Sequence, residues 1–316
     1  MDFFTHLVFG ALTYLLLLKE VTLDYLFLAI FFSILPDLDI LLAPLKKKFK
    51  SNYLEHRGGS HSYIIGIIIS FIISIIRSLL VQQPFIIVWI IGFSFYGLHV
   101  SMDLLTTTKI PYLFPISKKE YSFYVEKAGS FFTFVNSIIF LILPIFIFRL
   151  FTELFFIQLY LNIYTSLFLI YYFYRIMSKL IISRTLDKNQ KYLPGLLPFY
   201  FKLYYYEING NEIESRIEKK SHFSKKTEEI KIKATLSSQE KLFYDEAWKL
   251  NKKNYYFAKW TLFPTIIRRA EIFTVRFFFL ETMMRTRNMY IQYNFDLDTQ
   301  SYIGVEQGSG HIQNKT

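Results

Sequence analysis

The stretch that decides the fold is Tyr63–Val81, YIIGIIISFIISIIRSLLV, in which Arg77 is the single charged residue among 19. A helix that crosses the hydrocarbon core of a bilayer needs about 20 consecutive, mostly apolar residues. A helix that is apolar on every side must be surrounded by lipid or by the interior of a large protein. Tyr63–Val81 therefore predicts a transmembrane helix.

Similar apolar runs lie on both sides of this stretch. The alternative, a set of buried helices in a large soluble protein, is disfavoured because successive runs of this length rarely share a water-soluble core. The predicted fold is therefore a membrane α-helical bundle of about six transmembrane helices. The first run is short, and it either crosses the membrane or forms a hairpin with the next run. The further runs are Leu7–Leu18, Leu23–Ala43, Phe85–Val100, Phe131–Phe148 and Leu154–Met177.

The composition changes along the 316 residues of the chain. Residues 178–316 hold 23 of the 36 Lys and Arg residues and 15 of the 25 Asp and Glu residues, so the apolar part precedes them. Aromatic residues make up 20% of the chain, which excludes a disordered protein. The lack of cysteine excludes a disulfide scaffold and a cysteine-ligated zinc or iron–sulfur site. Any metal ion must be held by His, Asp, Glu or carbonyl oxygen.

Basic residues gather in alternate loops between the apolar runs, and such loops face the cytoplasm. The pattern predicts an integral protein of the inner (cytoplasmic) membrane with both termini in the cytoplasm. The first residues show no basic segment and no cleavage site of small residues, so no cleaved signal peptide is expected. The basic residues are Lys46, Lys47, Lys48, Lys50 and Arg57, then Lys109, Lys118, Lys119 and Lys127, then Lys179, Arg184, Lys188 and Lys191.

The charged C-terminal part has the pattern of a small, mostly β domain. Asn209-Gly210-Asn211 is a hairpin turn signal between the strand-like segments Leu196–Ile208 and Glu212–Glu218. Ser237 and Glu240 have the spacing of a capping box, which opens a helix. Further predicted strands are Ile230–Leu236, Tyr255–Phe263, Ala270–Glu281 and Arg287–Asp296. The expected domains are a transmembrane domain at 1–184, a soluble, mostly β domain with one helix at 185–303 and a flexible tail at 304–316.

Seven ionisable residues of the apolar part fall on the side predicted as cytoplasmic, whereas a random scatter would divide them between the two sides. Simpler explanations exist for some of them: Pro36-Asp37-Leu38-Asp39 could end a helix, and His99 and Asp103, one turn apart, could join two helices. Ionisable groups within a span are costly, however, which favours a functional role. The seven are His6, Asp37, Asp39, His56, His61, His99 and Asp103.

The most specific segment is the loop His56–Ser62, HRGGSHS. Its glycine pair allows backbone conformations closed to other residues, so the loop can fold both imidazoles towards one centre. Arg57 offers a fork of donors that suits a phosphate or a carboxylate. The alternative is a basic turn that touches lipid headgroups. Four imidazoles and three carboxylates suit Zn, Mn or Fe, and their number predicts either two ions or one ion with further groups that orient its ligands.

The ordered set of these motifs resembles a known family. It comprises Thr5-His6 with Gly10, Pro36-Asp37-Leu38-Asp39, the loop 56–62 and His99-Val100-Ser101-Met102-Asp103. The set is similar to the YdjM-like membrane-bound metal-dependent hydrolases, which are described as LexA-binding and inner-membrane-associated. The resemblance covers roughly residues 1–120. It implies metal-dependent hydrolysis and leaves the substrate open. Two departures are Ser60, where threonine is more usual, and Thr106–Ile110, which lacks a glycine often found after the aspartate.

The resulting hypothesis is a metal-dependent hydrolase at the cytoplasmic membrane face, with a lipid-like or phosphoester substrate. Either Asp37 or Asp39 completes or bridges the metal site, and Asp39 is the candidate general base if it is not a ligand. Arg57 is the candidate group that stabilises negative charge on the substrate. His6 is either a ligand or a group that orients one. The candidate ligands of one or two divalent ions (Zn, Mn or Fe) are His6, Asp37, His56, His61, His99 and Asp103.

Two other functions stay open at this stage. Intramembrane His and Asp residues also occur in ion or proton transporters, although such sites usually lie near the bilayer midplane between repeated halves. A non-catalytic membrane anchor could present the β domain to a protein partner. The basic charges of that domain are dispersed and suit the vicinity of anionic membrane lipid, so no direct binding of nucleic acid is expected.

Overall fold

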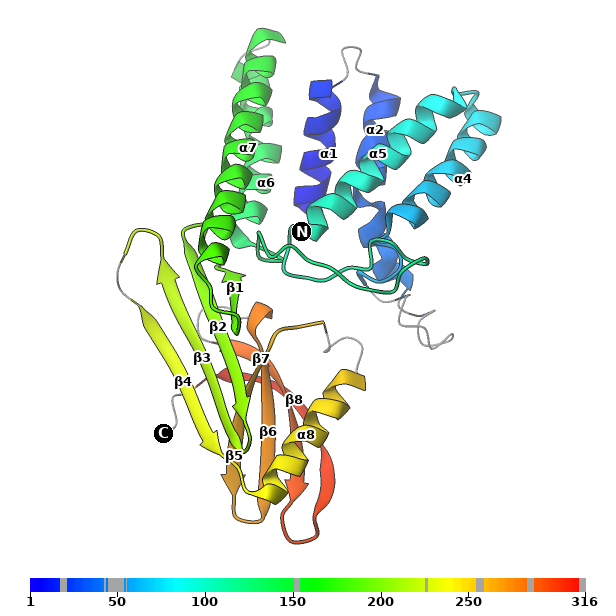
Figure 1. Ribbon diagram of the computed structural model, residues 1–316. Helices are drawn as coiled ribbons and strands as arrows, with labels where there is room; N and C mark the ends of the chain where they lie inside the picture. Colours follow the sequence, from blue (N-terminus) through cyan, green and yellow to red (C-terminus); the bar gives the residue numbers. More distant parts are fainter. Residues whose placement is uncertain are drawn as a thin grey trace. The chain divides into compact units, whose positions relative to one another are not determined.

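The computed structural model describes residues 1–17, 22–42, 44, 54, 56–150, 154–224, 227–253, 259–282 and 287–312. The chain divides into two compact units, Met1–Ser178 and Lys179–Thr316, and each is considered by itself (Figure 1). The first unit is helical and the second contains the β-sheets. The lysines expected at 46–48 and 50 in the first basic loop lie outside the described residues.

The helical unit consists of apolar helices, and the described connections include a long one between α5 and α6. Within the described part of the chain, four stretches are long and apolar enough to cross a membrane: Leu23–Leu42, Tyr63–Val81, Phe85–Leu104 and Gln158–Arg184. The predicted count of six spans is therefore not confirmed among the described residues. Helix α1 has 15 residues and, at about 1.5 Å per residue, is shorter than the roughly 30 Å core of a bilayer. The helices are α1 (Phe3–Leu17), α2 (Leu23–Ile34), the 3-10 helix η1 (Leu35–Leu42), α4 (Tyr63–Val81), α5 (Phe85–Leu104), α6 (Phe131–Leu150) and α7 (Leu154–Arg184).

One buried cluster joins α1, α2 and α5. Tyr14, Phe32, Val88 and Tyr96 are each no more than 1% exposed within it. The outward faces of the helices carry apolar side chains instead, as on α4, where Ile68 is 47% exposed. A buried polar or aromatic seam with apolar outer faces is the arrangement expected of helices surrounded by lipid.

Residues 105–130 connect α5 to α6 and are called the connecting segment below. In Figure 1 this segment runs past the helix ends near the N-terminus. Short β-bridges stabilise it, one between Ile110 and Tyr121 and one between Thr106 and Glu126. Tyr63 at the start of α4 donates its N–H to the carbonyl oxygen of Tyr112 at 3.0 Å. The connecting segment therefore ties the end of α5 to the beginning of α4.

The second unit contains two antiparallel four-stranded sheets in which each strand pairs with its neighbour in sequence. The predicted capping box is confirmed: Glu240 donates its N–H to Ser237 Oγ at 3.2 Å, and Ser237 donates its N–H to the Glu240 carboxylate at 2.8 Å. The predicted hairpin turn is also confirmed, with Gly210 at φ +60° between β2 and β3. The elements are β1 (Gln190–Pro194), β2 (Tyr200–Asn209), β3 (Glu212–Ser221), β4 (Glu228–Thr235), α8 (Ser238–Lys253), β5 (Leu262–Arg269), β6 (Ile272–Phe279), β7 (Arg287–Asp296) and β8 (Ser301–His311).

The structure corrects two expectations for this unit. Residues 304–311, predicted as the start of a flexible tail, belong to β8, which pairs with β7. Gly308 serves packing, because a Cβ there would lie 2.7 Å from the Tyr290 hydroxyl oxygen. The strand predicted at Tyr255–Phe263 begins instead at Leu262, as β5. Residues 254–258 and 313–316 lie outside the described part of the chain.

Candidate metal centre

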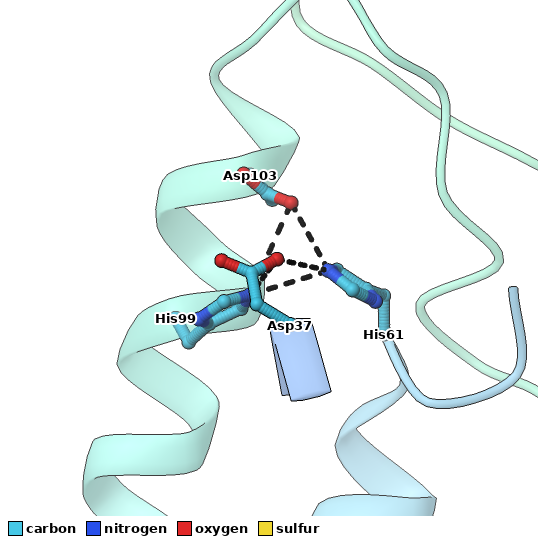
Figure 2. Close-up of side chains that lie close together, drawn as sticks. All are labelled: Asp37, His61, His99 and Asp103. Atoms are coloured by element: carbon cyan, nitrogen blue, oxygen red, sulfur yellow. Dashed lines mark hydrogen bonds and ion pairs between the residues drawn. The ribbon is translucent and has the colours of Figure 1, made fainter. Parts of the chain in front are cut away.

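Four candidate ligands from three segments converge at one end of the helical unit (Figure 2). Asp37 comes from η1, where Pro36 lacks the N–H that would continue α2 regularly. His61 comes from the loop before α4, and this loop turns at Arg57, which has φ +60°. His99 and Asp103 lie one turn apart on α5 and therefore share a face. The group is thus assembled by packing rather than by one local motif.

The donor atoms of this group are spaced as ligands of one small ion would be. His61 Nε2 lies 3.2 Å from His99 Nε2, 3.5 Å from Asp37 Oδ1 and 3.3 Å from Asp103 Oδ2. His99 Nε2 lies 3.7 Å from Asp37 Oδ1 and 4.0 Å from Asp103 Oδ2. All four donor atoms lie within 4.8 Å of one another. A tetrahedral ion with ligands at about 2.0–2.2 Å needs separations of about 3.3–3.6 Å, which these values bracket.

The hydrogen bonds behind the two imidazoles leave their Nε2 atoms as acceptors. His99 Nδ1 lies 2.7 Å from the carbonyl oxygen of Ser33, which can only accept, so Nδ1 carries the proton. His61 Nδ1 faces Ser60 Oγ at 3.0 Å and Asp39 Oδ2 at 3.4 Å, a pattern that likewise places the proton on Nδ1. Each Nε2 therefore directs a lone pair at the other. Such outer hydrogen bonds are those that fix the tautomer of metal-binding histidines.

The two carboxylates complete an electron-rich, buried cluster. His61, His99 and Asp103 are at most 1% exposed. Asp37 Oδ1 and Asp103 Oδ2 are buried, and neither accepts a hydrogen bond from the residues that the structure describes, although Arg57 Nε forms an ion pair with Asp103 Oδ2 at 3.3 Å. Buried carboxylate oxygens without donors are rare because their desolvation is not compensated. Two lone pairs and two such oxygens around one point fit a divalent cation.

Asp39 lies behind His61 rather than among the four donor atoms. Its carboxylate faces His56 Nδ1 at 2.7 Å, accepts the Arg57 N–H at 3.0 Å and accepts the Ser60 hydroxyl at 2.5 Å. The His56 side chain is 47% exposed and lies outside the group of four. The structure therefore places Asp39 where it orients His61. The predicted roles of Asp39 as general base and of His56 as ligand stay predictions.

The other two predicted residues, His6 and Arg57, border Asp103. His6 Nε2 lies 3.2 Å from Asp103 Oδ1, and the His6 ring stacks on that of His99 with centroids 3.6 Å apart. Arg57 Nε lies 3.3 Å from Asp103 Oδ2, and its other nitrogens donate to Thr108 Oγ1 at 2.8 Å and the carbonyl oxygen of Met1 at 2.6 Å. The amino group of Met1 also pairs with Asp103. The seven His and Asp residues singled out in the sequence, together with Arg57, thus gather at this end of the helices.

Some contributors carry no signal in the sequence. Ser33 orients His99 through its backbone carbonyl, which every residue possesses. Its position depends on a close approach of α1 and α2, since a Cβ at Gly10 would lie 2.2 Å from Ser33 Oγ. Gly10 belongs to the motif set that carries the family resemblance, so this glycine was the available signal. Thr108 was noted only as part of a segment that lacks a glycine.

The apolar helices and this buried group define a membrane protein with a candidate metal centre. A family model described as YdjM inner membrane protein matches residues 1–182, so the chain belongs to this family. The match contains the whole candidate centre and ends near the end of α7. No curated protein and no solved structure matches the chain significantly.

Proposed function

We propose that this chain is a membrane-bound metal-dependent hydrolase that acts at the cytoplasmic face of the membrane, where both termini lie. The observation that carries the proposal is the convergence of two imidazole nitrogens and two carboxylate oxygens on one buried point; among the described residues these two oxygens accept no hydrogen bond, and Arg57 pairs with the one from Asp103. A bound divalent ion would make a water molecule more acidic and polarise the bond to be hydrolysed. Two nitrogens and two oxygens suit Zn, Mn or Fe.

The residues around the centre have separable tasks in this proposal. Asp37, His61, His99 and Asp103 hold the ion. Asp39 and the Ser33 carbonyl hold the two imidazoles in the tautomer that presents Nε2. Four-coordinate catalytic zinc sites keep one position for water, so an ion with four protein ligands must accept a fifth ligand, as Mn and Fe readily do. The exposed His56 marks a side on which the centre approaches water.

The position of Arg57 is evidence for an anionic substrate. Its guanidinium lies 3.3 Å from the Asp103 oxygen that also belongs to the group of four. When that oxygen serves as a ligand, the guanidinium loses part of this interaction and can turn to a phosphate or a carboxylate. The location of the centre at the end of apolar helices favours a substrate that reaches it from the membrane. These two features together support a lipid-like phosphoester.

The test uses the full chain purified in detergent or nanodiscs. Its metal content is measured by mass spectrometry, and hydrolysis is measured with anionic and zwitterionic phospholipids, with and without Zn²⁺, Mn²⁺ or Fe²⁺. His61→Ala is expected to lose the metal and the activity, whereas His222→Ala in the soluble unit is expected to keep both. A wild-type chain that binds none of these metals refutes the proposal. A chain that binds metal but hydrolyses no phosphoester refutes the substrate assignment.

A further inference from the structure

A second cluster of buried charge lies away from the four candidate ligands. Arg175 on α7 is 0% exposed, and Glu126 of the connecting segment is 1% exposed. Arg175 Nε lies 2.9 Å from Glu126 Oε2, and its terminal nitrogen donates to Oε1 at 3.2 Å. The Tyr171 hydroxyl donates to Oε2, and the Lys127 N–H donates to Oε1 at 3.0 Å. Both carboxylate oxygens of Glu126 are thus held by several donors.

Stability alone does not account for such a pair. Removing two charges from water is expensive, and well-packed apolar residues often stabilise a protein as much as a buried ion pair does. A buried Arg in an apolar helix marks a functional constraint more often than a packing solution. The geometry that Arg and Glu impose is directional, because the guanidinium binds the carboxylate through two nitrogens. The pair therefore fixes the position of the backbone around Glu126.

Glu126 belongs to the stretch that caps the end of α5. The N–H groups of Val125 and Glu126 both donate to the Leu105 carbonyl oxygen at 2.9 Å, and the Phe123 N–H donates to the Leu104 carbonyl oxygen at 2.7 Å. The last carbonyls of a helix have no partner within the helix, so such outside donors fix its terminal turn. Asp103 lies in that turn.

A further link leads from this cap to Asp103 itself. Thr106 pairs with Glu126 in a parallel β-bridge. The same Thr106 donates its hydroxyl to the carbonyl oxygen of Asp103 at 2.8 Å and its N–H to that oxygen at 3.0 Å. A path of hydrogen bonds and peptide bonds, through Glu126, Leu105 and Thr106, thus joins Arg175 on α7 to the backbone of a candidate ligand on α5.

We propose that Glu126 and Arg175 are positioning residues of the candidate metal centre, acting through the end of α5 on Asp103. The inference rests on the proposed function in so far as it concerns a metal ion. Asp37 and His61 come from other segments, so the fourth donor reaches the common point only if the end of α5 is held in place. Sites of this kind tolerate displacements of about 0.5 Å, which a frayed helix end exceeds.

The experiment compares variants of the full chain by two readouts. Co²⁺ titration followed by visible absorption reports affinity and ligand geometry, and hydrogen exchange of residues 104–106 and 123–126 reports the cap without any metal. Glu126→Gln and Arg175→Met are expected to weaken Co²⁺ binding about 10- to 100-fold, the range found for groups that orient ligands. Both variants should also accelerate exchange of these amides at least tenfold. Tyr171→Phe should shift both readouts in the same direction by less.

Tyr164→Phe is the matched control, because the Tyr164 hydroxyl also ties α7 to a neighbour, donating to the Asn136 carbonyl oxygen at 2.7 Å. It is expected to leave Co²⁺ affinity within twofold of wild type. The double variant Glu126→Gln/Arg175→Met removes both charges and guards against a misfolded single variant. If the variants fold and the hydrogen exchange of residues 104–106 and 123–126 is the same as in wild type, Glu126 and Arg175 have no positioning role. If wild type binds no Co²⁺, the proposed function fails, and hydrogen exchange alone decides whether the pair holds the end of α5.

Discussion

Substitution of Asp37 by Asn should make the metal-free protein more stable and the metal-loaded protein less stable. Asp37 Oδ1 lies within 4.8 Å of the Asp103 donor oxygen. Two unit charges at that separation repel by about 3.5 kcal/mol at an effective dielectric constant of about 20. Arg57 and the Met1 amino group both pair with Asp103 and offset part of this repulsion, so we expect Asp37→Asn to gain about 1–3 kcal/mol without metal. For a domain of this size, that gain raises Tm by about 2–12 °C.

The metal-loaded state should show the opposite sign. At a metal concentration 100 times its Kd, binding stabilises the wild type by about 2.7 kcal/mol. A 100-fold weaker site at the same concentration yields only about 0.4 kcal/mol. Asp37→Asn should therefore start from a higher Tm with chelator present and rise far less when Zn²⁺ or Mn²⁺ is added.

The assay is thermal unfolding of the purified full chain, followed by circular dichroism, with EDTA and with each metal. Asp24→Asn is the control, because Asp24 is an exposed residue of the first turn of α2 and lies outside the group of four. A lower Tm of Asp37→Asn in EDTA would refute the reasoning, since it would mean that the Asp37 carboxylate has a stabilising partner in the metal-free protein. An equal response of both variants to metal would refute the assignment of Asp37 as a ligand.

Two further predictions concern packing and pH. A Cβ at Gly92 would lie 2.8 Å from Phe32 ring atoms, so Gly92→Ala should lower stability by about 1–3 kcal/mol in thermal unfolding. Gly97→Ala on the same helix meets nothing closer than 3.7 Å and should be neutral; equal losses would contradict the packing argument. In the unit that contains the β-sheets, the hydrogen bond from Arg268 is the largest of the causes that lower the pKa of Glu240. Because the folded pKa is depressed, the pair stabilises above the usual Glu pKa and the stabilisation is lost as pH falls through the folded pKa. Glu240→Gln should therefore be less stable than wild type at pH 7, and its stability should fall less than that of wild type when the pH drops below about 4.5. Unfolding is followed by the infrared band of the β-sheet. Parallel stability profiles of the two proteins over pH would contradict this prediction.

Elements whose signal is local could be predicted from the sequence. The apolar stretch Tyr63–Val81 and the strand Arg287–Asp296 have the same bounds in the structure as in the prediction. The length of an apolar run, the content of β-branched residues and the capping box each depend on residues that are close in sequence, so they can be recognised from the sequence alone. β8 was not predicted because glycines are unfavourable in strands, and the packing of Gly308 against Tyr290 on the neighbouring strand cannot be read from a local pattern.

The candidate site was predictable as a set of residues but not as a geometry. Asp37 and Asp39 are two residues apart and chemically identical, yet one faces His99 Nε2 and the other faces His56 and Ser60. Sequence reasoning left open which of them completes the site. The choice depends on how η1 turns after Pro36 and where the loop 56–62 packs on it, and both are consequences of helix packing.

Residue type and order by themselves determined that the first half of this chain is apolar, that any metal must be held by nitrogen and oxygen, and that seven ionisable residues fall at one side. Hydropathy and donor chemistry belong to individual residues, so they need no fold. Only the tertiary structure decided which four donor atoms meet and that Glu126 pairs with Arg175, 49 positions along the chain. Such pairings form when helices pack and bring distant segments within 4 Å of each other. The separation of two residues along the chain does not determine which helix faces pack together, so these pairings cannot be read from the sequence.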